Sequence, residues 1–309
     1  MNDISIENLW IVIPTYNRSG DLLECIASLN LAGISDNKII VVDNHSQDDT
    51  VVSLQKSHPG IKLIALDKNF GATGASNIGF DYALQNQAEF ILRLDSDTVV
   101  DPDFVRPLIV EAVNDEKIGI LSPKIYYYDR PDVIWYAGAY ANPWHLGVSR
   151  DHRNEKDSSQ NTQVQEVDYV WGAALLIKSE VLKKTSGFDT DFFVYHEELD
   201  FCRRVRDLGY KLIFTPHSKI WHKVGSNLNN DWTAYQWNRS KMIFYKKHAK
   251  HGVHFLFLII YALLYALIDA FLSFTSLRKK SGNRGPLKSA IRGLWDGFKF
   301  QLGKQGSSF

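Results

Sequence analysis

Two aspartates one residue apart, Asp95 and Asp97, are the first candidates for chemistry in this sequence. They follow residues 91–94, a short run of mostly branched apolar side chains with the length of a buried strand. The two carboxylates would then lie at the carboxyl end of a strand, the edge of an open α/β sheet where ligands bind. Oxygen ligands gathered there suit Mg²⁺ or Mn²⁺ carrying substrate phosphates. The alternative is an ordinary turn or helix cap, which an isolated Asp-x-Asp pattern favours.

Three further apolar runs precede this pair, and each ends in polar residues. They are 9–13, which ends at Pro14 to Asn17, 39–42, which ends at Asp43 to Ser46, and 61–66, which ends at Asp67 to Asn69. Segments with helical periodicity separate the runs, as in repeated strand-helix units. We therefore predict an α/β fold with a Rossmann-like, mostly parallel central sheet that brings these polar residues to one edge.

A run of small residues, 69–79, follows the third predicted strand and leads into a helix. Such a run allows the backbone to approach a ligand closely. It does not match the G-x-G-x-x-G fingerprint, and the first predicted strand-to-helix turn has no glycine before Gly20. A nicotinamide-dependent dehydrogenase is therefore disfavoured.

Three acids lie close together at the start of another predicted helix: Glu197, Glu198 and Asp200. They could simply favour the helix dipole. A carboxylate facing the Asp95 and Asp97 edge could instead take a proton from an attacking hydroxyl. His222 follows the last predicted strand, and a lone histidine is usually structural unless a metal site lies beside it.

Composition and charge indicate a globular protein with an unusual C-terminal part. The chain has 309 residues, of which 45% are apolar and 23% charged, with zero net charge and two cysteines. From Lys241 onward, however, twelve lysines and arginines face only two acids, Asp269 and Asp296. This asymmetry predicts an anionic partner for the C-terminal part. The N-terminus lacks the pattern of a cleaved signal peptide, so we expect a reducing, cytoplasmic compartment.

The C-terminal part, 226–309, is predicted to be a helical, basic, membrane-associating tail. The segment from His251 to Ile268 carries no formal charge if histidine is neutral, and this segment is long enough to span a membrane. A helix lying in the membrane interface is favoured because basic clusters flank both ends and because polar residues recur along one face: Tyr265, Asp269, Ser273 and Ser276. The segment 287–302 has the pattern of a basic amphipathic helix of the membrane-surface type. Packing on a second subunit is the remaining alternative, and the apolar run disfavours nucleic acid.

The order of the motifs resembles the inverting glycosyltransferases of family 2 with the GT-A fold, most closely the rhamnosyltransferase-like members. Seven segments carry the resemblance: 11–18, 41–46, 69–79, 95–97, 171–174, 197–200 and 220–222. Each is loose alone, but their order and spacing are together specific, and they cover residues 9 to about 225. The resemblance implies a catalytic domain over 1–225, with a nucleotide-binding half over about 1–100 and an acceptor half over about 101–225.

The resemblance also implies roles for individual residues. The nucleotide would be bound by residues at the ends of the first four strands: Pro14, Thr15, Tyr16, Arg18, Asp43, Asn69, Gly71, Asn77 and Asp95. Asp95, Asp97 and His222 would hold Mg²⁺ or Mn²⁺. Glu198 would be the catalytic base, with Glu197 as the alternative, since aspartate is commonest at this position. Trp171 and Gly172 would contact the acceptor.

The expected activity is the metal-dependent transfer of a sugar, rhamnose by analogy, from a dTDP- or UDP-sugar to a glycan or polyprenyl-linked acceptor. The enzyme would work at the cytoplasmic face of the membrane as a peripheral or monotopic protein. A catalytically degenerate glycan-binding relative is the non-enzymatic alternative. A sugar nucleotidyltransferase is disfavoured because it requires a glycine-rich first loop bearing Arg or Lys, which residues 14–18 are not.

Overall fold

A computed structural model describes residues 8–150, 152–158, 161–224, 231–274 and 287–300. The chain divides into two compact units, which we describe separately. The first contains residues 1–141, 148–188 and 201–224, and the second contains 142–147, 189–200 and 225–309.

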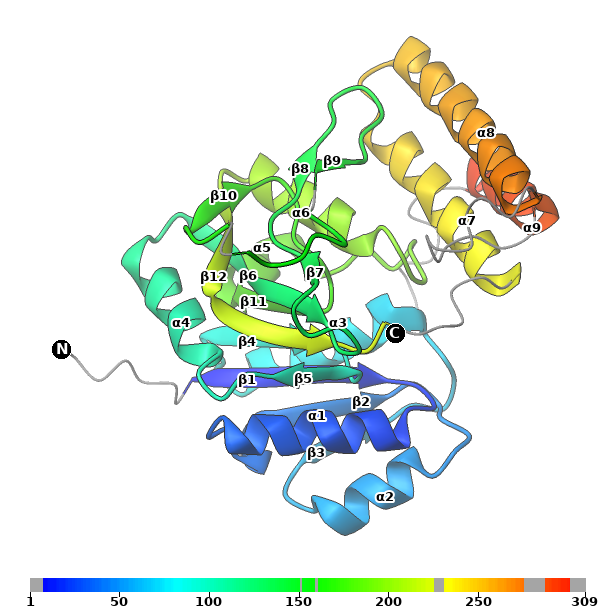
Figure 1. Ribbon diagram of the computed structural model, residues 1–309. Coiled ribbons are helices and arrows are strands. Elements are labelled where there is room, and N and C mark those ends of the chain that lie inside the picture. The colour runs from blue at the N-terminus through cyan, green and yellow to red at the C-terminus, as the bar shows by residue number, and fades with distance from the viewer. Residues whose placement is uncertain (1–7, 151, 159–160, 225–230, 275–286, 301–309) are drawn as a thin grey trace. The chain divides into compact units, whose positions relative to one another are not determined.

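The first unit is an α/β domain in which strands and helices alternate along its N-terminal part (Figure 1). In chain order its elements are β1 (Leu9–Thr15), α1 (Ser19–Leu31), a 3₁₀ helix (Asp36–Lys38), β2 (Ile39–Asp43), α2 (Thr50–Ser57), β3 (Lys62–Ala65), α3 (Gly71–Gln85), β4 (Phe90–Leu94), β5 (Thr98–Val100), α4 (Val105–Asn114), β6 (Ile118–Tyr127), β7 (Ile134–Tyr136), β8 (Tyr140–Ala141), β9 (Val148–Arg150), β10 (Gln165–Val167), β11 (Ala174–Lys178), α5 (Ser179–Thr185) and β12 (Lys211–His222). Helix α6 (Glu197–Asp207) begins in the second unit and continues into the first.

The central sheet is mixed, so the prediction of a mostly parallel sheet was wrong. Its strand order is β10-β12-β6-β11-β4-β1-β2-β3, with β5 added to β12 and β7 added to β6. Strands β1 to β4 are parallel to one another, but β11 runs antiparallel to both of its neighbours, β4 and β6. A buried apolar run has the same pattern in either direction, because the pattern reports burial on both faces and carries no information on strand polarity. The predicted α/β class itself is confirmed.

Close packing of α3 on the sheet explains the small residues of the run 69–79. A methyl group at Gly79 would overlap the side chain of Val12 and lie 3.3 Å from Val42, which are residues of β1 and β2. Gly71, the first residue of α3, has φ of +77°, a conformation that other residues adopt only with strain. Gly79 thus lets the middle of α3 lie close against β1 and β2.

The described helices of the second unit are α7 (Asp231–His248), α8 (Gly252–Phe274) and α9 (Leu287–Lys299). Helix α9 lies close against α7, because methyl groups at Gly293 and Gly297 would overlap the carbonyl oxygens of Tyr235 and Arg239. The ring of Phe255 in α8 stacks on Phe298 in α9 at 6.3 Å between centroids. Three helices therefore form a packed group rather than a set of separate tail helices.

Of the polar stripe expected on the 251–276 segment, the structure describes the side chain of Tyr265, while the side chains of Asp269, Ser273 and Ser276 lie outside the described residues. Tyr265 lies under the ammonium of Lys241 of α7, at 5.2 Å from Nζ to the ring centroid. Residues next to it on the helix, Leu258, Ala262 and Ala266, are buried. The opposite face of α8 is apolar and exposed. Among the described residues, no helix has the length and apolar character needed to cross a membrane.

Candidate metal and nucleotide site

Strand pairing brings Asp95, Asp97 and His222 together in the first unit. Asp95 follows β4, and its amide donates to the carbonyl of Ala173 at 3.0 Å. The chain then turns into β5, which pairs antiparallel with the end of β12, so that His222 lies opposite Thr98. The amide of Lys223 donates to the carbonyl of Asp97 at 2.9 Å and closes this pairing. Residues more than 120 positions apart thus meet because β5 and β12 share a register.

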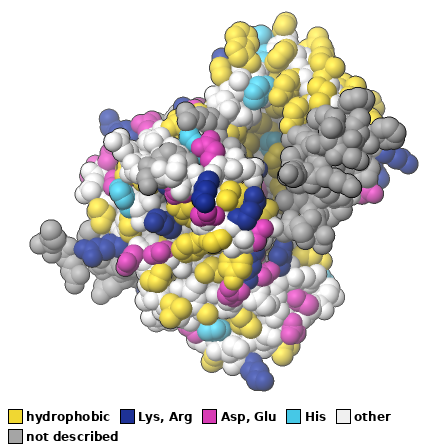
Figure 2. Space-filling view, in the orientation of Figure 1, with side chains coloured by type: hydrophobic (Ala, Val, Ile, Leu, Met, Phe, Trp, Pro, Cys, Tyr) yellow, Lys and Arg dark blue, Asp and Glu magenta, His cyan; other side chains and the backbone are white. Residues whose placement is uncertain are grey.

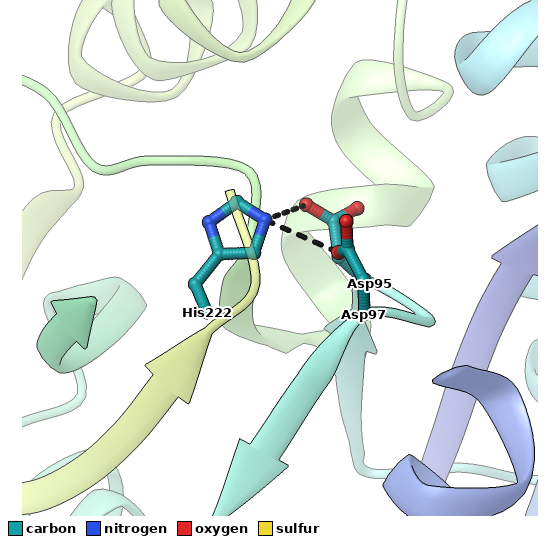
Figure 3. A group of neighbouring side chains, drawn as sticks. All are labelled: Asp95, Asp97 and His222. Atoms are coloured by element: carbon teal, nitrogen blue, oxygen red, sulfur yellow. Dashed lines mark ion pairs between the residues drawn. The ribbon is translucent and has the colours of Figure 1, made fainter. Parts of the chain in front are cut away.

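The imidazole of His222 points one ring nitrogen toward both carboxylates, which lie together on one side of it (Figure 3). Its Nε2 is 3.1 Å from an oxygen of Asp97 and 3.9 Å from an oxygen of Asp95. The three side chains can each offer one ligand atom, and these atoms lie within 4.8 Å of one another. The predicted cluster of metal-binding residues is therefore present in the geometry.

Each carboxylate also faces an arginine. Arg93, in the middle of the buried strand β4, places Nη1 2.6 Å from Asp95 and also donates to the carbonyl of Gly172. Arg18, just before α1, has Nη2 3.6 Å from Asp97. The two arginines hold the carboxylates in place and offset part of their mutual repulsion.

The electrostatic field at this cluster favours a cation. Burial lowers the pKa of His222, but the hydrogen bond to Asp97 and the charges of both aspartates outweigh it and raise the pKa overall. Burial of Asp97 raises its pKa, and the interactions with His222 and Arg18 reverse this, so that the pKa is lowered. Both shifts show that the pair of carboxylates stabilises positive charge beside it.

The donor set fits a divalent ion such as Mg²⁺ or Mn²⁺. Two carboxylates and one imidazole are a mixed oxygen and nitrogen set of the kind that Mn²⁺ accepts, and carboxylate oxygens suit Mg²⁺. Three protein ligands would leave further coordination positions for substrate phosphates. The identity of the metal does not follow from these residues.

Two buried polar atoms beside this edge have no hydrogen-bond partner among the described residues. They are Oγ1 of Thr15 and one carboxylate oxygen of Asp43. The two residues are register partners at the ends of β1 and β2, and they are 3% and 2% exposed. The other oxygen of Asp43 accepts from the amide of Ser46 at 3.0 Å. Unpaired polar groups in a buried position are costly unless a ligand or water satisfies them, so this position fits a polar ligand.

The loops after β1 and β2 are tied together around these two residues. The amide of Asn17 donates to Ser46 Oγ at 2.8 Å, and Asn17 Oδ1 accepts from the amide of Gln47 at 2.6 Å. Tyr16, predicted to lie beside the base, is 46% exposed. Pro14 is the residue before Thr15, the last residue of β1.

The remaining predicted nucleotide residues have backbone roles in this structure. Asn69 Oδ1 accepts from the amide of Gly71 at 2.9 Å, which fixes the start of α3. Asn77 donates to the carbonyl of Phe188 at 2.8 Å and accepts from its amide at 2.9 Å. Since these two bonds use both ends of the Asn77 amide, Asn77 holds α3 to the segment before residue 189.

The predicted acceptor residues, Trp171 and Gly172, lie in the segment that precedes β11. This segment is not a strand, because β10 ends at Val167 and β11 begins at Ala174. Trp171 is 8% exposed, and its Nε1 has no hydrogen-bond partner in the described part of the chain. The contact of Gly172 with Arg93 links this segment to Asp95.

The candidate bases, Glu197 and Glu198, open α6 in the second unit. Asp200, three residues after the start of this helix, is fully buried, forms an ion pair with Lys247 of α7 at 2.8 Å and lies within hydrogen-bonding distance of His248 Nε2, also at 2.8 Å. Asp200 therefore stabilises the second unit, which separates its role from that of the two preceding acids.

Sequence reasoning missed two residues that contact the metal cluster, Arg93 and Trp135. Arg93 could have been noticed as a charge inside an apolar strand, since an unpaired buried arginine is rarely tolerated. The position of Trp135 depends on the pairing of β7 with β6, for which the sequence carries no local signal.

The fold and the cluster together define a glycosyltransferase of the GT-A type. Residues 10–185 match the family model described as glycosyl transferase family 2, and the chain belongs to this family. The predicted resemblance is thereby confirmed.

Relatives with known names are distant. A dTDP-rhamnosyl transferase of Shigella flexneri is 25% identical over 222 residues, which cover 71% of this chain and 70% of that protein. An N-acetylglucosaminyl-diphospho-decaprenol L-rhamnosyltransferase of Mycobacterium tuberculosis is 22% identical over 248 residues, which cover 72% of this chain and 78% of that protein. Among solved structures, GalNAc-T7 with UDP, GalNAc and Mn²⁺ aligns with a TM-score of 0.60 at 15% identity, over 92% of this chain and 55% of that chain. The last likeness concerns the fold alone.

Proposed function

We propose that this glycosyltransferase moves a sugar from a nucleoside diphosphate donor to a hydroxyl group of a glycan acceptor, with a divalent metal ion and with inversion at the anomeric carbon. The observation that carries the proposal is the cluster of Asp95, Asp97 and His222 at the carboxyl edge of the sheet. The buried, unpartnered polar atoms of Thr15 and Asp43 at the same edge support a nucleotide site beside it.

A bound Mg²⁺ or Mn²⁺ would offset the negative charge that develops on the departing diphosphate. The chain's own residues hold and orient the donor. Asp43 and Thr15 would accept and donate hydrogen bonds to the base and ribose, with Tyr16 beside the base. Arg18 is 40% exposed at its side chain and carries a charge that can contact a phosphate once Asp97 binds the metal.

We assign the proton transfer to Glu198. Its carboxylate would take the proton of the acceptor hydroxyl while that oxygen bonds to the anomeric carbon and the bond to the diphosphate oxygen breaks. The nucleoside diphosphate leaves from the opposite face of the sugar, so a single displacement inverts the anomeric centre. Glu197 is the alternative base.

The named relatives support rhamnose as the transferred sugar and dTDP as its carrier. The relative from Shigella flexneri is named for dTDP-rhamnosyl transfer, and the relative from Mycobacterium tuberculosis is named for transfer to a diphospho-decaprenol-linked sugar. We extend both properties to this chain as a proposal: a rhamnosyl donor, and a lipid-linked acceptor reached through Trp171 and Gly172.

The test is a panel of dTDP-, UDP- and GDP-sugars assayed with Mn²⁺, with Mg²⁺ and with a chelator, scored by release of nucleoside diphosphate. We expect release with one donor class that depends on the metal. Absence of both hydrolysis and transfer with every donor would favour a glycan-binding relative without catalysis. NMR of the product would show the inverted anomer.

The base assignment has its own matched pair of variants. Glu198→Gln should lower kcat by orders of magnitude while the affinity for the nucleoside diphosphate stays within a few-fold, because an amide keeps the shape but cannot accept the proton. Glu197→Gln serves as the control. Wild-type turnover in Glu198→Gln together with loss in Glu197→Gln would transfer the role to Glu197.

We also propose that the second unit binds the surface of an anionic membrane, which would place the enzyme at the cytoplasmic face beside a lipid-linked acceptor. One face of α8 exposes large apolar side chains along its described length: Val253, Leu256, Phe257, Ile260, Leu263, Leu264, Leu267 and Ile268. Helix α9 exposes Ile291, Trp295 and Phe298. Figure 2 shows apolar side chains gathered over the helices of this unit. Exposed apolar faces of this extent are characteristic of interaction sites.

The basic residues of these helices favour an anionic lipid surface as the binding partner of the apolar face. The same helices carry basic residues at or beside them, among them Lys250 before α8 and Lys288, Arg292 and Lys299 on α9. The ammonium of Lys299 lies over the ring of Trp295 at 4.5 Å, so cation and aromatic side chain are presented together. Each basic residue near an anionic bilayer contributes about 1 kcal/mol to binding.

Vesicle sedimentation tests this surface. We expect the protein to bind vesicles of phosphatidylcholine with phosphatidylglycerol more tightly than phosphatidylcholine alone. Ile260→Ser with Leu264→Ser should weaken binding, whereas Leu31→Ser, at an 80% exposed position on α1 of the first unit, should not. Dimerisation through this face, seen by analytical ultracentrifugation together with failure to bind vesicles, would refute the proposal in favour of a second copy of the chain.

A further inference from the structure

A tryptophan lies directly against His222 of the candidate metal-binding group, Asp95, Asp97 and His222. The rings of Trp135 and His222 are 4.7 Å apart between centroids and nearly perpendicular, at 87°. Trp135 is the middle residue of β7, and its neighbours Ile134 and Tyr136 are fully buried. Since side chains alternate along a strand, Trp135 points to the face opposite these two residues. The imidazole of His222, at the end of β12, lies against it there.

His222 lacks the contact that usually orients a histidine ligand. A metal-binding histidine normally donates its second ring N–H to a carboxylate, a carbonyl or water, which fixes the ring. Nε2 of His222 faces the two aspartates, but Nδ1 is buried and has no hydrogen-bond partner in the described residues. The orientation of the imidazole must therefore come from packing, and the indole of Trp135 provides a perpendicular ring contact.

Trp135 is itself held on more than one side. The guanidinium of Arg153 lies 5.2 Å from the centroid of Trp135 and 5.3 Å from that of Trp171. The two indoles are 6.1 Å apart. Such cation and ring contacts restrict an aromatic side chain that two χ angles alone would leave free to rotate.

The segment that carries Arg153 is tied to the strand of Trp135. The amide of Ile134 donates to the carbonyl of Glu155 at 2.8 Å, and the amide of Asn154 donates to the carbonyl of Ile134 at 2.9 Å. Asp157 accepts from Lys124 at 3.0 Å and from the hydroxyl of Tyr126 at 2.5 Å. Hydrogen bonds from residues 154–157 thus support β7 and the strand β6 beside it.

We infer that Trp135 is a positioning residue for the metal ligand His222, and that it sets the affinity of the site for the divalent ion without contacting the ion or the sugar. The inference rests on the metal centre of the proposed function. It assigns to ring packing the role that a hydrogen bond plays at most histidine ligands. Removing the indole should let the imidazole of His222 adopt other rotamers and reduce the fraction of protein ready to bind metal.

Direct measurement of Mn²⁺ binding, by electron paramagnetic resonance of the free ion, tests this inference without reference to turnover. Losing an outer contact of a metal ligand weakens metal binding about 10- to 100-fold. We expect a change of this size for Trp135→Ala and recovery of most of the affinity in Trp135→Phe, which keeps an aromatic ring. In a turnover assay, Trp135→Ala should need more Mn²⁺ but approach wild-type kcat when Mn²⁺ saturates.

Trp10→Ala is the matched control. Trp10 lies on β1 of the same unit and makes a perpendicular ring contact with Tyr82, at 6.1 Å and 74°, but it contacts no residue of the cluster. Its removal should leave the Mn²⁺ affinity unchanged. If Trp135→Ala does not fold, Trp135→Leu retains an apolar side chain without the ring and tests the same contact.

The outcomes separate this inference from the proposed function. If the wild-type protein binds Mn²⁺ and both Trp135→Ala and Trp135→Leu bind it equally well, the positioning role is overturned and the metal centre stands. If the wild-type protein binds neither Mn²⁺ nor Mg²⁺, with or without nucleoside diphosphate, the metal centre itself is refuted and the role of Trp135 falls with it. A loss of kcat at saturating Mn²⁺ with unchanged Mn²⁺ affinity would instead make Trp135 a substrate contact.

Discussion

Replacing His196, the residue before the acidic pair of α6, should change how the stability of this protein depends on pH. His196 is buried in the second unit between the rings of Trp237 and Phe244, with centroids 4.8 and 5.8 Å away. Its Nδ1 has no hydrogen-bond partner within the described ranges. Burial, reinforced by the charge of Lys241, lowers the pKa of His196 to about 3. The native protein therefore keeps this imidazole neutral throughout the physiological range.

The size of the effect follows from the difference between the folded and unfolded states. In the unfolded chain a histidine has a pKa of about 6.5, so below that pH the unfolded state binds a proton that the native state does not. Stability is then lost as pH falls through about 6.5, and the loss continues down to the native pKa of about 3. Between pH 7 and pH 5 the loss is about 2 kcal/mol, at about 1.4 kcal/mol per pH unit below the unfolded value. Because pH 5 lies well above the native pKa, this magnitude depends mainly on the unfolded state.

The variant His196→Phe keeps an aromatic ring in the same cage and removes the titrating group. Urea unfolding at pH 7 and pH 5, followed by circular dichroism, gives the free energy of unfolding for both proteins. The wild-type protein should lose about 2 kcal/mol more than the variant between the two pH values. His217→Asn, at an exposed histidine of β12, controls for the loss of a histidine as such. Equal pH dependence of the wild-type protein and His196→Phe would refute the buried, neutral state of His196.

Two further predictions concern packing and charge. A methyl group at Gly79 would overlap β1, so Gly79→Ala should lower the free energy of unfolding by about 1–3 kcal/mol in urea titrations. Gly20→Ala is the control and should not lower it, because nothing lies within 4 Å of a methyl group there. Equal stability of the two variants would contradict the close contact of α3 with the sheet. Asp200 is fully buried and paired with Lys247, so Asp200→Ala should lower the melting temperature by an amount equivalent to about 3 kcal/mol. The same change at Asp207, exposed at the end of the same helix, is the control, and similar melting temperatures for the two variants would argue against a buried ion pair.

Much of the nucleotide half could be predicted from local sequence, because each signal is complete within a few residues. Short branched apolar runs that end in polar residues identified β1 to β4 and their carboxyl ends, where Asp43, Asp95 and Asp97 lie. The small residues 69–79 were interpreted as allowing close approach to a ligand, which stays a prediction, whereas the structure shows Gly79 packed against Val12 of the sheet. The metal-ligand role of His222 was predicted from the resemblance to the family, because a lone histidine by itself favours a structural role.

Other features depend on contacts between distant segments. The reversal of β11 between β4 and β6 turned the expected parallel sheet into a mixed one, and no property of the 174–178 run indicates direction. On α8, the sequence showed a narrow polar stripe, but the described residues expose an apolar face, and Tyr265 of the stripe lies under Lys241 of α7.

By itself, the sequence determined that two carboxylates end a buried strand in an α/β protein and that a small-residue helix follows β3, since periodicity and residue size act locally. Only the tertiary structure decided which side chains complete the site. His222 meets Asp97 through the register of β5 on β12, and Trp135 meets His222 through the pairing of β7 with β6. Registers of this kind are set by the burial of whole faces against one another, and that energy belongs to pairs of segments rather than to either one alone.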